Sequence, residues 1–155
     1  MATNIPDRIE KKILLRAPRS RVWRAITDTA EFNSWFRVTL TSPFVPGKET
    51  SGKITYPGYE HLTMTVWVEK LEPERLFSFR WHPYAVEEGM DYAKEPTTLV
   101  EFHLEEGPEG TLVTLTESGF DKVPQARRAK AFESNDQGWA EQMQNLERHV
   151  LGKGR

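Results

Sequence analysis

The sequence predicts an α+β fold in which a curved antiparallel sheet of about seven strands surrounds one long C-terminal helix. Between residues 37 and 117, short segments with alternating apolar side chains follow one another, separated by turns rich in Pro and Gly. Consecutive strands joined by short turns are typical of an antiparallel meander. Residues 124–151 carry apolar side chains at helical spacing instead, and a helix of this length needs a curved sheet to lie in.

The N-terminal part of the chain is expected to form one strand and two short helices. Apolar side chains alternate over residues 8–17, as in a half-buried strand. Pro18 suits the first turn of a helix, because its missing N–H is not needed there. Asp28 is the expected N-cap of a second helix, with Glu31 in the capping-box position, and this helix should end near residues 35–36.

Six further strands are expected in the middle of the chain. Their apolar side chains alternate over residues 37–45, 54–56, 62–71, 77–81, 97–105 and 111–117. Each segment ends at a Pro- or Gly-containing turn or at a charged one. The acidic segment 84–96 shows no clear period and is therefore predicted to be a loop.

The long C-terminal helix is predicted from an apolar stripe. The stripe consists of Ala126, Ala129, Phe132, Trp139, Met143, Leu146 and Val150. Its spacing places these side chains on one face of a helix, which would pack against the sheet. Gly138 interrupts the pattern, where glycine costs about 1 kcal/mol relative to alanine. We therefore expect a bend there, or a close approach of the helix backbone to another group.

Composition restricts the class of protein. The 155 residues are expected to form a single domain with its core at 8–151, and the net charge of −2 gives no case for nucleic-acid binding. The absence of cysteine excludes disulfides and thiolate chemistry. Residues 1–12 are polar and unlike a signal peptide, and no apolar run approaches the ~18 residues of a membrane span. We therefore predict a cytoplasmic protein.

The aromatic side chains are the main candidates for a binding site. Aromatic residues make up 11% of the chain, and they either build a heavy core or line an apolar cavity. One helix and a strongly curved sheet close only around bulky side chains, and methionines suit a wall that adapts to its ligand. The predicted wall residues are Trp35, Phe36, Met64, Val66, Phe77, Phe79, Phe102, Trp139 and Met143. Plain core packing is the alternative for each of them.

Glu117 is the single candidate for acid–base catalysis. Strand alternation places it on the inward face with Val113 and Leu115, but its position at a strand end favours a solvated rim. The four histidines lack the spacing of metal ligands, so neither a metal site nor a cofactor is predicted. Residues 47–53 nearly match a phosphate-binding loop, but Ile54 stands where Ser or Thr is required, so we interpret them as a hairpin turn.

Several stretches in a fixed order resemble one protein family. They are residues 22–28 with 35–36, 72–76 with 79–81, 110–111 with 117–120, and 135–139 with Leu146. Together they extend over nearly the whole chain. They resemble the domain homologous to the activator of the Hsp-90 chaperone ATPase, which is one branch of the Bet v 1 or START-like superfamily.

The resemblance implies a helix-grip fold with an apolar cavity and, in some members, binding of small hydrophobic molecules. We therefore expect a carrier, a sensor or a stress-related protein that binds a hydrophobic ligand as a monomer or homodimer. A chaperone-interaction module acting through its surface is the second hypothesis. Eukaryotic activators carry a further N-terminal domain that contacts the chaperone, and we expect no such domain in this chain. A cyclase or hydrolase is the third hypothesis, because fold alone does not decide function.

Overall fold

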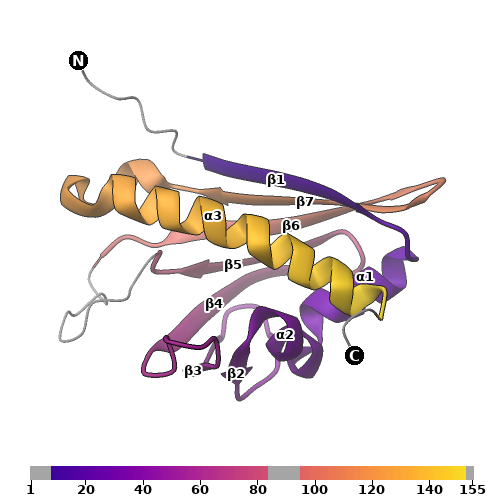
Figure 1. The fold of residues 1–155 in the computed structure, drawn as a ribbon, viewed down its shortest axis with the longest axis horizontal. Helices are drawn as coiled ribbons and strands as arrows, with labels where there is room; N and C mark the ends of the chain where they lie inside the picture. The colour runs from indigo at the N-terminus through magenta and orange to yellow at the C-terminus, as the bar shows by residue number, and fades with distance from the viewer. Residues whose placement is uncertain (1–7, 84–94, 153–155) are drawn as a thin grey trace.

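The structure, a computed structural model, describes residues 8–83 and 95–152. Its elements are β1 (Arg8–Leu15), α1 (Arg19–Thr27), α2 (Thr29–Phe36), β2 (Val38–Leu40), β3 (Glu49–Ile54), β4 (Thr63–Glu72), β5 (Leu76–Trp81), β6 (Thr98–Gly107), β7 (Gly110–Ser118), the 3-10 turn η1 (Phe120–Lys122) and α3 (Gln125–Val150). Within the described residues, seven antiparallel strands form one sheet in the order β1-β7-β6-β5-β4-β3-β2. Figure 1 shows α3 crossing this sheet, with α1 and α2 below the C-terminal end of α3. The predicted α+β helix-grip fold is confirmed.

Alternating burial explains how the strands face α3. In β6 the side chains of Thr98, Val100, Phe102 and Leu104 are buried, and those between them are half-buried. The period of two directs every second side chain to the same face of the sheet. The register pairs Phe102 with Phe77 of β5, and their stacked rings have centroids 6.2 Å apart. Aromatic rings from neighbouring strands therefore form the floor beneath the helix.

The two short helices form as the local sequence predicts. Asp28 accepts a hydrogen bond from the backbone N–H of Glu31 at 3.0 Å, which caps α2. The helix α2 ends at Phe36, and Arg37 follows in the left-handed conformation with φ of 70°. This conformation reverses the chain into β2 and brings residue 37 to the edge of the space below α3.

Three predicted details of the sheet and its connections need correction or lie outside the described residues. The strand expected over 37–45 is limited to β2, because the Ser42 N–H donates to the Thr50 hydroxyl instead of continuing the backbone ladder. The strand expected near 54–56 is β3, which ends at Ile54 instead of beginning there. Most of the loop predicted at 84–96 lies outside the described residues.

The apolar stripe of α3 is shorter than predicted. Trp139, Met143, Leu146 and Val150 are buried, as is Ala131; Phe132 is half-buried and packs edge-on against Phe120. The predicted stripe members Ala126 and Ala129 are exposed instead. The first turns of α3 extend beyond the ends of β1 and β5 in Figure 1, so their side chains have no sheet to pack against.

Candidate ligand pocket and the buried carboxylate behind it

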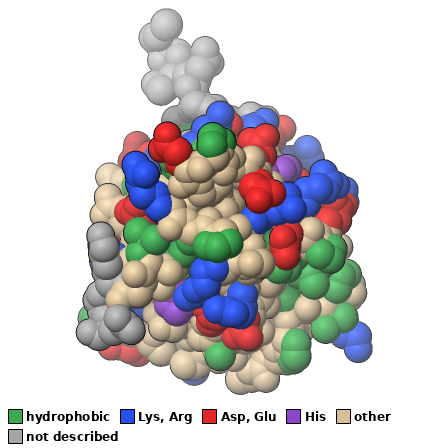
Figure 2. Space-filling model, turned by 90° about the vertical axis from the view of Figure 1, so that its right-hand side faces the viewer, with side chains coloured by type: hydrophobic (Ala, Val, Ile, Leu, Met, Phe, Trp, Pro, Cys, Tyr) green, Lys and Arg blue, Asp and Glu red, His purple; other side chains and the backbone are tan. Residues whose placement is uncertain are grey.

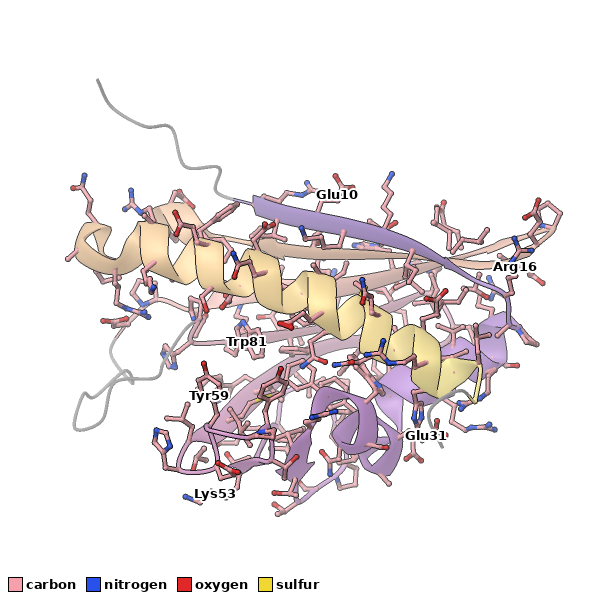
Figure 3. The ribbon with its side chains drawn as sticks, viewed as in Figure 1. Glu10, Arg16, Glu31, Lys53, Tyr59 and Trp81 are labelled. Carbon is pink, nitrogen blue, oxygen red and sulfur yellow. The ribbon has the colours of Figure 1, made fainter. Side chains whose placement is uncertain are left out.

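A pocket of about 510 Å³ lies between α3 and the part of the sheet formed by β3, β4 and β5. Its lining residues are Phe36, Arg37, Ile54, Tyr56, Tyr59, Leu62, Thr63, Met64, Thr65, Trp67, Trp81, His82, Ser134, Asn135, Gly138, Trp139, Glu141, Gln142 and Asn145. In Figure 3, Trp81 lies beneath α3, and Tyr59 lies below it on the connection between β3 and β4. The volume falls within the range of about 300–1,000 Å³ that is typical of small-molecule sites.

Three aromatic rings form the apolar inner wall of the pocket. The ring centroids of Phe36, Trp81 and Trp139 lie 5.6–6.0 Å from one another. They come from α2, β5 and α3, so the wall depends on the packing of all three elements. Gly138 lines the pocket beside Trp139, and a Cβ atom built on it would have no neighbour within 4 Å. Of the two alternatives predicted at this glycine, a bend or a close approach, the close approach is absent, and the glycine opens space for the pocket.

The predicted wall residues divide between the pocket and the core. Phe36, Met64 and Trp139 line the pocket. The other six, Trp35, Val66, Phe77, Phe79, Phe102 and Met143, are buried in the hydrophobic core and lie outside the pocket lining. Alternation and helical spacing identify inward-facing side chains, but they do not separate those that touch one another from those that face a space. For these six, the predicted position on the pocket wall is corrected.

Several pocket aromatics lie outside the predicted set. Tyr56 and Tyr59 come from the turn between β3 and β4, and they are 39% and 48% exposed. Trp67 of β4 also lines the pocket and packs edge-on against His82, with centroids 5.5 Å apart. Two tyrosines flanking a Pro-Gly turn were the available signal, since Gly, Pro, Asn, Asp and Ser are the residues that dominate turns.

Glu117 is fully buried behind the inner wall, at 0% exposure. Its Oε1 accepts a hydrogen bond from the indole N–H of Trp139 at 2.8 Å, and its Oε2 accepts one from the indole N–H of Trp81 at 2.8 Å. The Asn135 amide donates to both oxygens at 3.0 and 3.1 Å, and the Thr98 hydroxyl donates to Oε2. The prediction of an inward face is confirmed, and the prediction of a solvated rim is wrong.

The environment of Glu117 acts on its pKa in two opposing directions. Burial raises the pKa and is the larger influence, whereas the hydrogen bonds from Thr98, Trp81, Trp139 and Asn135 lower it, leaving the pKa above its ordinary value. An indole N–H can only donate, so both tryptophans require an acceptor at this point. Glu117 itself is outside the pocket lining, and it therefore contacts the pocket through the rings that it holds.

The opposite end of the pocket is polar. The Gln142 amide donates to the backbone carbonyl of Phe36 at 3.0 Å, and the Asn145 amide donates to the Gln142 side-chain oxygen at 3.1 Å. The guanidinium carbon of Arg37 lies 5.4 Å from the ring centroid of Tyr56. The pocket is therefore amphipathic, with indole rings on its inner wall and amide and guanidinium groups toward the C-terminal end of α3.

Two further features concern only the residues that the structure describes. Among residues 8–83 and 95–152, no group of three or more His, Asp or Glu side chains is arranged to hold a metal ion. In the same ranges, no helix is both long enough and apolar enough to cross a membrane.

The fold and the pocket between helix and sheet define a protein of the START-like, helix-grip class. A family model described as activator of Hsp90 ATPase homolog 1-like protein matches residues 16–150. The chain therefore belongs to this family, as its sequence motifs indicated. A comparison with curated proteins finds no significant match.

Solved structures of similar fold come from several bacteria. Protein MLL2253 from Mesorhizobium loti is 19% identical over 96% of this chain and 98% of its own, with a TM-score of 0.74. DynU16, from the dynemicin biosynthetic locus, is 24% identical over 96% of this chain but 49% of its own, with a TM-score of 0.74. The Aha1 dimer from Colwellia psychrerythraea is 20% identical over 95% of this chain and 98% of its own, with a TM-score of 0.70. At these identities the likeness concerns the fold alone.

Proposed function

We propose that this protein binds a small hydrophobic molecule in the pocket between α3 and the sheet, as a carrier or a sensor. The observation that carries the proposal is the pocket of about 510 Å³ with the rings of Phe36, Trp81 and Trp139 along one wall. Apolar ligands gain affinity from the area they remove from water, at about 25 cal/mol per Å². We favour binding over catalysis, because the buried carboxylate of Glu117 is separated from the pocket by the two indoles that it holds.

Gly138→Leu is the sharpest test of the pocket's position. The site is helical and lines the pocket, and a Cβ atom added there would have no neighbour within 4 Å, so we expect a leucine side chain to occupy pocket space and not to displace the core. Leucine also has a higher helix propensity than glycine, so the variant should fold at least as well as the wild type. Ala140→Leu is the matched control, because Ala140 lies on the exposed face of the same helix.

The binding measurement combines native mass spectrometry of the purified protein with a titration followed by tryptophan fluorescence. Trp67, Trp81 and Trp139 line the pocket, so ligand entry should change the emission. We expect a panel of aliphatic and aromatic compounds to contain binders whose affinity falls at least about tenfold in Gly138→Leu, a loss of about 1.4 kcal/mol. Ala140→Leu should bind them like the wild type. Equal affinity in Gly138→Leu would place the binding site elsewhere, and a panel without binders would contradict the proposal.

A further inference from the structure

A second, smaller pocket adjoins the polar end of the first. It has a volume of about 190 Å³ and is lined by Arg37, Tyr56, Glu141, Gln144, Asn145 and Arg148. Four of these residues, Arg37, Tyr56, Glu141 and Asn145, also line the large pocket, so the two spaces adjoin along α3. Every side chain of the small pocket carries a polar or charged group. A ligand that filled both spaces would therefore be apolar at one end and polar at the other.

The two arginines of the small pocket differ from most other arginines of the described residues in the partners of their guanidinium groups. Arginines that form ion pairs with described carboxylates are Arg8, Arg16, Arg19, Arg21, Arg24, Arg75, Arg80 and Arg127. Arg37 packs on the ring of Tyr56, and Arg148 donates to the neutral side chain of Asn145. Glu141 is the one acidic residue in the lining of the small pocket, so two positive charges face one negative charge there.

The backbone of Arg37 supports a role for its side chain. Arg37 has φ of 70° at the end of α2, a position at which glycine is the usual residue. A non-glycine residue in this conformation is strained, because its Cβ atom comes close to the following carbonyl oxygen. Its carbonyl accepts from the Thr55 N–H at 2.9 Å, which fixes the strained turn beside the pocket. Arg37 lines both pockets, so this turn places its side chain where the two spaces meet.

We propose that the ligand is an amphipathic carboxylate, with its apolar body in the large pocket and its carboxylate between Arg37 and Arg148. This inference rests on the proposed function, since it names the chemical class of the molecule that the same site takes. A guanidinium matches a carboxylate with two parallel N–H···O bonds, and such charge-assisted bonds are about twice as strong as neutral ones. The side-chain amides of Gln144 and Asn145 are further donors in the same small space.

Decanoate and decanol are the probes that separate the two ends of the site. They share the same apolar chain and differ in the head group, so the ratio of their affinities reports the head-group site alone. We expect the wild type to bind decanoate about tenfold more tightly than decanol at neutral pH and low salt, with the ratio falling as salt is added. Isothermal titration calorimetry or tryptophan fluorescence gives both dissociation constants.

Three variants test the assignment of residues. The double variant Arg37→Asn with Arg148→Gln should lower decanoate affinity about tenfold and change decanol affinity less than about twofold, since asparagine accepts the left-handed conformation. Glu141→Gln should strengthen decanoate binding and leave decanol binding unchanged, because it removes the negative charge from the small pocket. Lys130→Gln is the control, because it removes a positive charge from an exposed position of α3 outside both pockets.

The outcomes separate this inference from the proposed function. Binding of decanol that Gly138→Leu blocks supports the apolar pocket. If decanoate then binds no better than decanol, or if the double variant leaves the ratio of the two affinities unchanged, the carboxylate inference is wrong while the apolar pocket is supported. If neither probe binds to the wild type, the carboxylate inference is wrong, and the proposed function fails as well if the whole panel of hydrophobic compounds lacks a binder. A Lys130→Gln effect as large as that of the double variant would mean that net charge, and not the small pocket, attracts decanoate.

Discussion

At the scale of single residues, Glu117 is the group on which the pocket's inner wall depends. Its two oxygens accept from the indoles of Trp81 and Trp139, which come from a strand and a helix. Each indole ring is thereby fixed at its N–H group, and both rings line the pocket. A buried carboxylate that holds four donors is therefore a positioning group for the wall.

Replacing Glu117 by leucine should lower the free energy of unfolding by at least about 2 kcal/mol. Leucine fills a similar space but leaves the indole N–H of Trp139 and the hydroxyl of Thr98 without their acceptor, and each unpaired buried donor costs about 1–3 kcal/mol. Glu117→Gln should lose less, because it keeps one acceptor oxygen. Urea unfolding followed by circular dichroism measures both variants. A leucine variant as stable as the wild type would mean that the indoles find other partners.

The position of Glu117 could be predicted from the sequence only in part. Strand alternation correctly placed its side chain on the inward face, because the period of two is a property of the strand itself. The donors that make its burial tolerable lie 18 to 36 residues away in the sequence, on β5, on α3 and at the start of β6. No local pattern indicates such a set of partners. The strand-end position alone therefore suggested a solvated rim.

At the scale of elements, α3 forms one side of the pocket, and Gly138 is the position at which the missing side chain leaves space for it. An exposed or pocket-facing glycine inside a helix is unfavourable relative to alanine by about 0.5–1 kcal/mol, mainly through backbone entropy. Here the cost coincides with an opening beside Trp139, where a Cβ would meet no other atom within 4 Å. The glycine enlarges the pocket at the expense of helix stability.

Gly138→Ala should therefore raise the free energy of unfolding by about 0.5–1 kcal/mol. The added methyl group contacts nothing within 4 Å, so no steric penalty opposes the gain. Ala140→Gly, on the exposed face of the same helix, is the reverse control and should lower stability by a similar amount. Thermal or urea unfolding of the two variants checks both signs. A loss of stability in Gly138→Ala would show that the helix needs the glycine for its backbone geometry.

Most elements form close to their predicted bounds, and β2 and β3 are the exceptions. The helix α3 and the strands β4 to β7 all form close to their predicted positions. The strand β2 has three residues, because the side chain of Thr50 replaces a backbone partner at Ser42. The pocket aromatics Tyr56 and Tyr59 lie in a turn, where no period exists to indicate the direction of a side chain.

At the scale of the whole molecule, one charged network joins the three helices. Glu31 of α2 pairs with Arg21 at 2.7 Å and with Arg24 at 2.9 Å, both from α1, and contacts His149 of α3 at 2.9 Å. Glu31 lies beside the C-terminal end of α3 in Figure 3. Figure 2 shows this end of the molecule, where acidic and basic side chains are interspersed. The network therefore anchors the far end of the helix whose middle lines the pocket.

Glu31 and Glu117 should each make the free energy of unfolding depend on pH, and the two dependences should have opposite signs. Burial alone would raise the pKa of Glu31, but the hydrogen bonds from His149, Arg21 and Arg24 lower it overall. Its contribution is therefore present above the ordinary value of 4.5 and is lost as the pH falls through its folded-state pKa. Burial raises the pKa of Glu117, so its contribution is present below 4.5 and is lost as the pH rises through its folded-state pKa.

Urea unfolding at a series of pH values separates these two contributions. Glu31→Gln should flatten the loss of stability on the acid side, below about pH 4.5. The free energy of unfolding of Glu117→Gln, compared with that of the wild type, should become less unfavourable or more favourable as the pH rises above about 4.5. The reason is that the variant carries no charge to bury. A difference between the wild type and Glu117→Gln that stays constant across the series would contradict a raised pKa. The carboxylate behind the indole wall would then titrate at its ordinary value despite its burial.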